Sequence, residues 1–307
     1  MHGIAYAASA DISLATAPAS QPGIAVVQPS ALEGEKALLI PRKWSNDPYF
    51  DRQWAFGRFG MLPPAEGNRG EKVTVAVLDT GVDASHEDMQ GMVTKNICFS
   101  DSNTPFDING HGTHVSGIIG AVSNNNVGIA GAADNVRILN VKVAEDNGMV
   151  WASNVADGVR WAVDNGADII NMSLAAASPS RALQSAIEYA WDRGVVLVAA
   201  AGNYTKAVTY PAAFPEVIAV AAIGSDGILW ENSNDGYFVD AYAPGVDIFS
   251  TLPGDTYGYC NGSSMAAAYI SAFVAVAFDS VDDENGNGMG NDEIARLIQN
   301  LFRDTGL

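Results

Sequence analysis

Apolar runs of strand length alternate along this chain with segments of helical periodicity, and this alternation limits the possible folds more than any other feature. We expect strands over 73–79, 136–143, 167–174, 195–203 and 217–223, and helices over 111–123, 152–166 and 180–194. Strands separated by helices in this way pair in parallel, with helices on both faces of the sheet. The pattern predicts an α/β fold with a doubly wound, mainly parallel sheet flanked by helices.

Composition divides the chain into a short leader and one large domain. Hydrophobic residues make up 48% of the 307 residues, which is enough for a large buried core. Residues 1–45 are rich in Ala, Ser and Pro and have weak periodicity, so we interpret them as an N-terminal extension or propeptide remnant. Residues 46–307 form the predicted folded domain. The first residues lack the basic start and long apolar run of a signal peptide.

Charge and cysteine content exclude several classes of protein. Acidic residues outnumber basic ones 35 to 16, and the formal net charge is −19. Such a surface repels phosphates and anionic lipids, so we expect no nucleic acid and no membrane as partners. The acidity fits a soluble protein, with adaptation to salt or cation binding as the alternative. Two cysteines, Cys98 and Cys260, are too few for a disulfide framework, and we expect free thiols.

Three predicted strands end in polar residues, at the edge where a doubly wound sheet places its ligands. These residues are Asp79, Ser173 and Asn203. A buried carboxylate such as that of Asp79 is costly unless it is hydrogen-bonded or paired. On its own, Asp79 is as well explained by capping the turn that follows.

Histidines are rare in this chain, and one of them opens a predicted helix. His111 lies between two glycines that leave its ring approachable, and His114, three residues later, is expected to pack inside. A zinc site from these two is incomplete, because no nearby cysteine or third histidine joins them. Ser264 lies at the start of another helix, which is rich in alanine and fit for burial.

Asp79, His111 and Ser264 follow one another in the chain order of an Asp–His–Ser triad. In such a triad the imidazole activates the hydroxyl, and a buried carboxylate orients the imidazole. An oxyanion also needs donors, and the side-chain amide of Asn203 and the backbone N–H of Ser264 can supply them. Together these four residues predict nucleophilic acyl-transfer chemistry.

Four segments resemble the motifs of the subtilisin-like serine proteases, the subtilase family. They are VAVLDTGVDASHEDM, NGHGTHVSGIIGA, VLVAAAGN and APGVDIFSTLPGDTYGYCNGSSMAAAYISA, in that order. The resemblance covers the chain from about Asn46 onward and implies a three-layer subtilisin-like fold and serine endopeptidase activity. It implies that Ser264 is the nucleophile, His111 the base and Asp79 its orienting carboxylate, with Asn203 in the oxyanion hole. Ser263 stands where the family usually has threonine.

The resemblance also implies where a peptide substrate binds. In this family the peptide adds as a strand to two edge segments. The residues that match these segments and the walls of the pocket before the cut are Gly148, Met149, Val150, Ser173, Leu174, Ala175, Ala200, Gly202 and Thr209. None is charged, so we expect a preference for apolar or aromatic side chains before the cut. Cys260 is expected to line the pocket on the leaving-group side.

Two oxygen-rich loops predict structural calcium. The segment 124–131 resembles the calcium loop of the family, and its implied ligands are Asp47, Asp88 and Asn125 with the carbonyls of Val127 and Ile129. The segment 282–292 matches the start of an EF-hand loop at Asp283, Asn285, Asn287 and Gly288. Its twelfth position is Ile294 instead of glutamate, so an ion-free surface turn is the alternative, as is a shortened loop closed by Asp292 or Glu293.

The leader and the biological setting allow several hypotheses. Residues 37–44 weakly resemble the short blocking extension of intracellular subtilisins, so a propeptide or inhibitor in the cleft is one expected partner, and removal of residues 1–45 should then raise activity. Otherwise we expect protein or peptide substrates, a monomer and a secreted protein, with an intracellular one as the alternative. The alternatives to hydrolysis are acyl transfer to an amine, as in a peptide ligase or cyclase, and a non-enzymatic calcium-dependent binding descendant.

Overall fold

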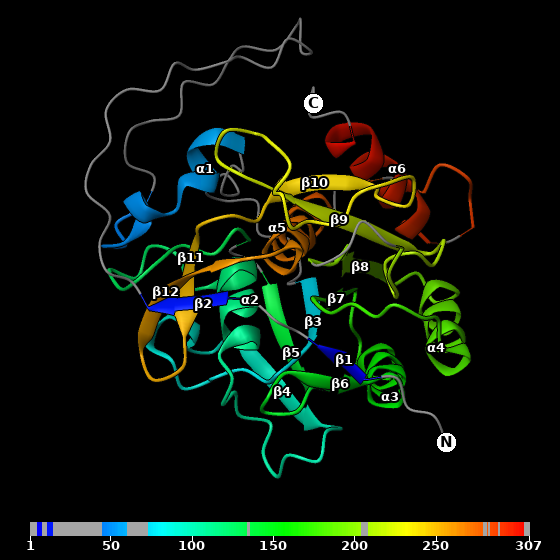
Figure 1. Ribbon diagram of the computed structural model, residues 1–307, viewed down its shortest axis with the longest axis horizontal. Helices are drawn as coiled ribbons and strands as arrows, with labels where there is room; N and C mark the ends of the chain where they lie inside the picture. The colour runs from blue at the N-terminus through cyan, green and yellow to red at the C-terminus, as the bar shows by residue number, and fades with distance from the viewer. Residues whose placement is uncertain are drawn as a thin grey trace, which may run out of the picture.

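Seven parallel strands form the central sheet of the computed structural model, which describes residues 5–7, 11–14, 45–59, 73–133, 136–203, 208–278, 281, 283–287 and 289–303. The strand order is β10-β9-β8-β7-β3-β5-β4 (Figure 1). The strands are β3 (Val73–Asp79), β4 (Val93–Cys98), β5 (Val136–Lys142), β7 (Ile169–Met172), β8 (Val196–Ala200), β9 (Val217–Ile223) and β10 (Ala241–Pro244). The predicted doubly wound α/β fold is confirmed.

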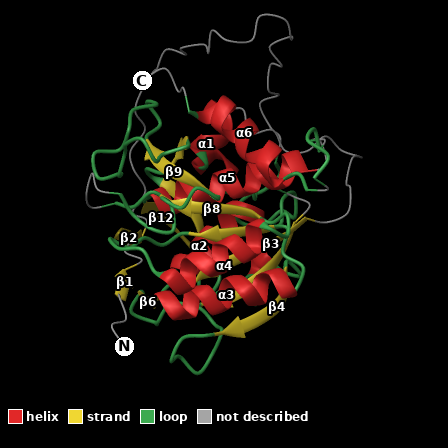
Figure 2. Ribbon diagram, turned by 90° about the vertical axis from the view of Figure 1, so that its right-hand side faces the viewer, coloured by secondary structure: helices red, strands yellow, loops and turns green. Residues whose placement is uncertain are grey.

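Helices cover both faces of this sheet (Figure 2). The helices are α1 (Trp54–Phe59), α2 (His111–Gly120), α3 (Ala152–Asp164), α4 (Arg181–Trp191), α5 (Ser263–Ala277) and α6 (Asn291–Phe302), with single 3-10 turns η1 (Phe50–Arg52) and η2 (Glu87–Met89). Alternate residues of β3 serve the two faces: Val75 and Val77 pack with α2 and α5, whereas Ala76 and Leu78 pack with α3 and α4. Because both faces are buried, central strands such as β8 and β9 are continuously apolar, whereas the edge strand β4 is partly exposed and carries polar residues.

The strand order reverses beside β3. From β3 the chain runs to the edge strand β4 and returns to β5 between them, and it then crosses to the other side of β3 and builds outward from β7 to β10. Neighbouring crossovers diverge at such a point and leave a crevice at the carboxyl ends of the strands. The sheet thus places the end of β3, at Asp79, where a ligand can be reached.

Two small antiparallel sheets lie outside the main sheet. One pairs β1 (Ala5–Ala7) with β6 (Met149–Trp151), and the other has the order β11-β12-β2. Their remaining strands are β2 (Asp11–Leu14), β11 (Ile248–Leu252) and β12 (Thr256–Asn261). The predicted extension therefore pairs with the main domain at both of its described pieces, which weak sequence periodicity does not foretell. Residues 37–44 lie outside the described residues.

Within the described residues, no helix has both the length and the apolar character needed to cross a bilayer. Both cysteines are free thiols, as expected. Cys260 is fully buried in the core, and burial raises its pKa to about 12. The expectation that Cys260 lines a leaving-group pocket is therefore wrong: the side chain points into the core from β12.

Candidate active site

The end of one strand and the beginnings of two helices meet at the candidate site. Asp79 is the last residue of β3, His111 the first of α2 and Ser264 the second of α5. A Cβ on Gly112 would lie 2.1 Å from the carbonyl oxygen of Gly81, so only glycine lets α2 approach the turn after β3 this closely. The glycine that follows His111 thus serves the contact between the helix and the strand end.

Asp79 holds the ring of His111. Nδ1 of His111 lies 2.7 Å from Oδ1 of Asp79, and both side chains are 1% exposed. The backbone N–H of Thr80 donates to the same carboxylate oxygen at 2.7 Å. Burial alone lowers the pKa of His111, but the charges of Asp79 and Asp107 and the hydrogen bond to Asp79 raise it above its ordinary value.

Ser264 and His111 are not hydrogen-bonded to each other in this structure. The hydroxyl of Ser264 donates to the carbonyl oxygen of Ser173 at 3.3 Å. Nε2 of His111 is buried and has no hydrogen-bond partner among the described residues. A rotation of the serine side chain is needed to join the two, and catalytic hydrogen bonds commonly tighten only when substrate binds.

Asn203 presents an amide N–H at this edge of the sheet. Its Oδ1 accepts hydrogen bonds from the backbone N–H and the hydroxyl of Ser263, both at 2.8 Å. The same hydroxyl accepts from the backbone N–H of Gly202 at 3.0 Å. Because Oδ1 is used in this way, the orientation of the amide is fixed and its Nδ2 is the group that remains to donate to an oxyanion.

The segments predicted to pair with substrate lie on β6 and just beyond β7. These residues are Gly148, Met149 and Val150 on the first segment and Ser173, Leu174 and Ala175 on the second. Two hydrogen bonds join Ser173 to Ser264. The carbonyl oxygen of Ser173 accepts from the Ser264 hydroxyl, and the Ser173 hydroxyl donates to the carbonyl oxygen of Ser264 at 2.9 Å. Leu174 is buried in the core, and Ala175 is half-buried.

The predicted pocket residues gather around the end of β8. Ala200 is the last residue of that strand, and Thr209 donates its hydroxyl to the carbonyl oxygen of Ala201 at 2.6 Å. Gly202 has φ +102°, and a Cβ there would lie 2.5 Å from Nδ2 of Asn234. Asn234 is buried and donates to Ala201 at 2.8 Å, which sequence reasoning missed because no motif marks it.

The first predicted calcium loop brings its residues together from three parts of the chain. Oδ1 of Asp47 accepts from the N–H of Asn125 at 3.0 Å, and Oδ1 of Asp88 accepts from Nδ2 of Asn125 at 2.9 Å. The loop N–H groups of Val127 and Ile129 donate to Asn125 and Asp88, both at 2.7 Å. Burial raises the pKa of Asp88, although its hydrogen bonds oppose the rise, and the nearby charge of Asp47 raises it further.

The second predicted calcium loop is exposed and held by local contacts. Oδ1 of Asp283 accepts from the N–H of Gly286 at 2.8 Å, and the amides of Asn285 and Asn287 donate to Asp292 at 2.7 and 3.4 Å. Gly288, which belongs to the predicted pattern, lies outside the described residues. In the described part of the chain, no group of three or more His, Cys, Asp or Glu is placed to hold a metal ion.

Two further residues near His111 have no counterpart in the sequence prediction. Asp107 is fully buried and accepts hydrogen bonds from the first turn of α2 and from Thr80. Lys142 ends β5 with a fully buried side chain. Lysine and aspartate are mostly exposed, so neither position is marked by composition or spacing. His114 is buried as expected, and burial together with the charge of His111 lowers its pKa to about 3.

Comparison with known proteins identifies the family of this chain. The subtilase family model matches residues 70–305. The chain is 42% identical over 236 residues to a thermophilic serine proteinase of Bacillus sp. (strain AK1), covering 76% of this chain and 57% of that protein. It is 40% identical over 229 residues to thermitase of Thermoactinomyces vulgaris, covering 74% and 82%. The chain thus spans less than two thirds of the first of these relatives.

A solved structure supports the same assignment. Proteases from Pseudoalteromonas arctica PAMC 21717 match with a TM-score of 0.74 and 30% sequence identity, over 83% of this chain and 91% of that one. Subtilisin E of Bacillus subtilis (strain 168) is 36% identical over 263 residues, covering 83% of this chain and 65% of that protein. The chain belongs to the subtilase family.

Proposed function

We propose that this chain hydrolyses peptide bonds through an acyl-enzyme formed on Ser264. The observation that supports this most strongly is the 2.7 Å contact between Asp79 and His111 beside the N-terminus of α5, where Ser264 lies. The raised pKa of His111 suits a group that takes a proton from a hydroxyl and later returns it.

In the proposed reaction the Ser264 hydroxyl turns from Ser173 toward His111 and attacks the substrate carbonyl carbon. His111 takes the hydroxyl proton and then gives it to the leaving amine, while Asp79 holds the ring and stabilises the imidazolium. The developing oxyanion accepts hydrogen bonds from Nδ2 of Asn203 and the backbone N–H of Ser264. Water then attacks the acyl-enzyme, again with His111 as base, and releases the acid.

We propose that the peptide pairs with β6 and the segment after β7, and that apolar or aromatic side chains are preferred before the cut. The pocket residues Ala200, Gly202 and Thr209 carry no charge. Large apolar side chains are exposed at Phe106 and Ile108 in the loop before His111 and at Met149 and Trp151 on β6. A digest of a peptide library would test this preference, and dominant cutting after Lys or Arg would contradict it.

We also propose that the leader acts as an inhibitor in the cleft. Its strand β1 pairs with β6, with Tyr6 opposite Val150, and its strand β2 pairs with β12, with Asp11 opposite Asn261. β6 is the proposed substrate edge, and Asn261 lies three residues before the nucleophile. The two leader strands therefore lie beside the proposed substrate edge and beside the strand that leads to the nucleophile (Figure 1). We therefore propose residues 5–7 and 11–14 for the blocking role, and the hypothesis for residues 37–44 stays a prediction.

We propose that the loop over 124–129 holds a structural calcium ion. Two carboxylates, Asp47 and Asp88, face Asn125 there, and a cation would offset their mutual repulsion. Saturation to about 100 times Kd stabilises a protein by about 2.7 kcal/mol. Chelation should therefore lower the unfolding temperature, and Asp88→Asn should remove that difference. Asp283→Asn in the exposed loop is the control, and equal unfolding temperatures with and without calcium in the wild type would contradict the site.

Labelling with a serine-directed fluorophosphonate tests the catalytic proposal. We expect one adduct, on Ser264, and none in Ser264→Ala, with hydrolysis of a peptide amide lost in parallel. A label at Ser263, or no label once the leader has been removed, would sink the proposal in favour of a non-enzymatic binding protein. Transfer of the acyl group to an added amine in preference to water would show a ligase. Secretion stays a prediction, which fractionation of the producing cells can check.

A further inference from the structure

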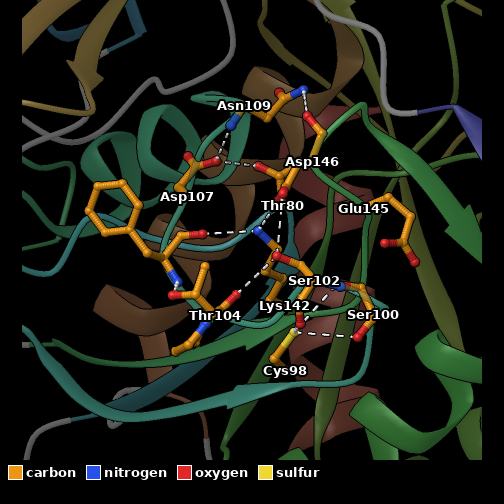
Figure 3. Close-up of polar contacts among 12 residues, drawn as sticks. Thr80, Cys98, Ser100, Ser102, Thr104, Asp107, Asn109, Lys142, Glu145 and Asp146 are labelled. Carbon is orange, nitrogen blue, oxygen red and sulfur yellow. Dashed lines mark hydrogen bonds and ion pairs between the residues drawn. The ribbon is translucent and has the colours of Figure 1, made fainter.

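A lysine is buried next to the catalytic strand end. Lys142 is the last residue of β5 and pairs in register with Asp79 of β3 on one side and Cys98 of β4 on the other. Its side chain is 0% exposed. A buried ammonium group is costly unless it is paired and hydrogen-bonded. Nζ donates to the carbonyl oxygen of Phe106 at 2.9 Å and to Oδ1 of Asp146 at 2.6 Å (Figure 3).

These two partners belong to different loops of the proposed active site. Phe106 lies in the segment 105–110, which leads into His111 at the start of α2. Asp146 lies in the turn 145–148, which leads into the substrate strand β6 and is closed by a bond from the N–H of Gly148 to the carbonyl of Glu145 at 2.8 Å. Lys142 therefore connects the loop that carries the base with the turn that carries the substrate edge.

A second bridge joins the same two loops. Nδ2 of Asn109 donates to the carbonyl oxygen of Asp146 at 3.2 Å (Figure 3). Oδ1 of Asn109 accepts from the backbone N–H of His111 at 3.3 Å. Asp146 is thus the point where both bridges end, one at its side chain and one at its backbone. Its own side chain is 40% exposed, so its position depends on these contacts and not on burial.

Hydrogen bonds to Asp107 hold the loop before His111 in place. Buried Asp107 accepts hydrogen bonds from the N–H of Gly110 at 2.8 Å, the N–H of Thr113 at 2.8 Å and the hydroxyl of Thr80 at 2.9 Å. These bonds join the loop to the first turn of α2 and to the strand end that carries Asp79. Hydrogen bonds therefore run without a gap from Asp146 through Lys142 to this loop and through Asn109 to the backbone N–H of His111.

We propose that Lys142, Asn109 and Asp146 are positioning residues that link peptide pairing on β6 to the placement of His111. The inference rests on the proposed peptidase function. It gives a physical reason for kcat to depend on the length of the substrate. A substrate long enough to pair with β6 fixes the turn at Asp146, and the two bridges then hold His111 in its catalytic position. A short substrate does not reach β6 and gains nothing from the bridges.

Two substrates and four variants of the full chain test this link. One substrate is a peptide amide with four residues before the cut, and the other is an ester of a single acylated residue. We expect Lys142→Met and Asp146→Asn to lower kcat on the peptide about tenfold, a coupling of ordinary size. The same variants should leave kcat on the ester nearly unchanged. Lys142→Arg, which keeps a charged donor, should restore part of the ratio between the two substrates.

Glu145→Gln is the matched control. Glu145 lies in the same turn, but its carboxylate accepts from the exposed N–H of Asp101, at 3.1 Å, and within the described residues it takes no part in either bridge. Rates are divided by the fraction of sites labelled by fluorophosphonate, so failure of the wild type to label rejects the catalytic proposal and not this link. If Lys142→Met does not fold, the exposed Asp146→Asn carries the test.

Three results would overturn the link. In the first, the peptide-to-ester ratio of Lys142→Met or Asp146→Asn equals that of the wild type. In the second, both substrates slow equally while the unfolding temperature falls, which is the behaviour of a residue with a purely structural role. In the third, the ratio rises, which would mean that the variant only releases strand β1 from β6.

Discussion

Asp79, His111 and Ser264 lie buried at the ends of core elements, whereas the strands that flank them, β6 and β12, are edges that also pair with the leader. In the centre, hydrogen bonds of 2.7 Å hold Asp79 and His111, and the Ser264 hydroxyl donates to a backbone carbonyl. At the rim, which consists of β6 and β12, the position of the backbone depends on pairing with an added strand, from the leader or from a substrate. It also depends on bridges such as the one through Lys142. The comparison indicates that the centre determines the chemistry and the rim determines access. Changes at the centre should lower kcat for all substrates, and changes at the rim should depend on the substrate.

The largest test of the centre is Asn203→Ala. Losing the amide N–H should lower kcat about a hundred- to thousandfold, the loss known for the oxyanion-hole asparagine of subtilisin. KM should change little, because the oxyanion forms only in the transition state. Steady-state kinetics on a peptide amide and an ester check both points. An equal loss in kcat on both substrates is expected, and a loss confined to the peptide would place Asn203 at the rim.

Removal of residues 1–14 is the largest test of the rim. If the leader favours the covered cleft by about 1.4 kcal/mol, activity should rise about tenfold when it is removed. Removal of residues 1–4, which precede β1, is the control and should have no effect. Initial rates on a peptide amide, divided by the fluorophosphonate-labelled fraction, give the comparison. Equal rates for the full chain and for the two truncated chains would show that the leader does not compete with substrate.

Ser263→Ala tests how the centre holds its oxyanion donor. The hydroxyl of Ser263 both donates to Asn203 and accepts from Gly202, so its loss frees the amide to rotate. One neutral hydrogen bond contributes about 1 kcal/mol, which corresponds to about fivefold in kcat. Ser263→Thr keeps the hydroxyl and should keep the rate. A normal rate in Ser263→Ala would mean that the backbone N–H of Ser263 alone orients Asn203.

Asp107→Asn should have the smallest effect, a shift in pH dependence. His111 acts as a base only when it is neutral, so activity appears as pH rises through its pKa. The negative charge of Asp107 helps to raise that pKa, and its removal should move the acid limb of kcat/KM to lower pH. The asparagine oxygen can still accept from α2. A limb that stays in place would show that Asp79 alone sets the pKa of His111.

The sequence predicts the centre of the site better than its rim. The apolar runs predict the parallel strands, and polar residues at the ends of these runs point to Asp79 and Asn203, because burial makes such residues conspicuous. Ser264 at the start of an apolar helix is visible for the same reason. The chain order of these residues is then enough to suggest the chemistry.

The rim escapes this kind of reasoning because its features depend on long-range pairing. Three-residue strands such as β1 and β6 are too short to show a period, and their pairing joins segments far apart in the chain. Lys142 belongs to a predicted strand, yet its burial depends on carbonyl and carboxylate partners 36 and 4 residues away. The turned-away hydroxyl of Ser264 is a rotamer, which no sequence pattern encodes.

The burial of helix α5 has a consequence for how this protein unfolds and loses activity. It is buried along most of its length between the sheet, α2 and α6, with Ser264 in its first turn (Figure 1). Backbone amides in such an element exchange with deuterium only when the whole domain opens. The nucleophile is therefore mounted on one of the last elements to come apart. As denaturant is added, the edge strands should loosen first, so peptidase activity should be lost early. Labelling of Ser264 by fluorophosphonate should persist until the whole domain unfolds.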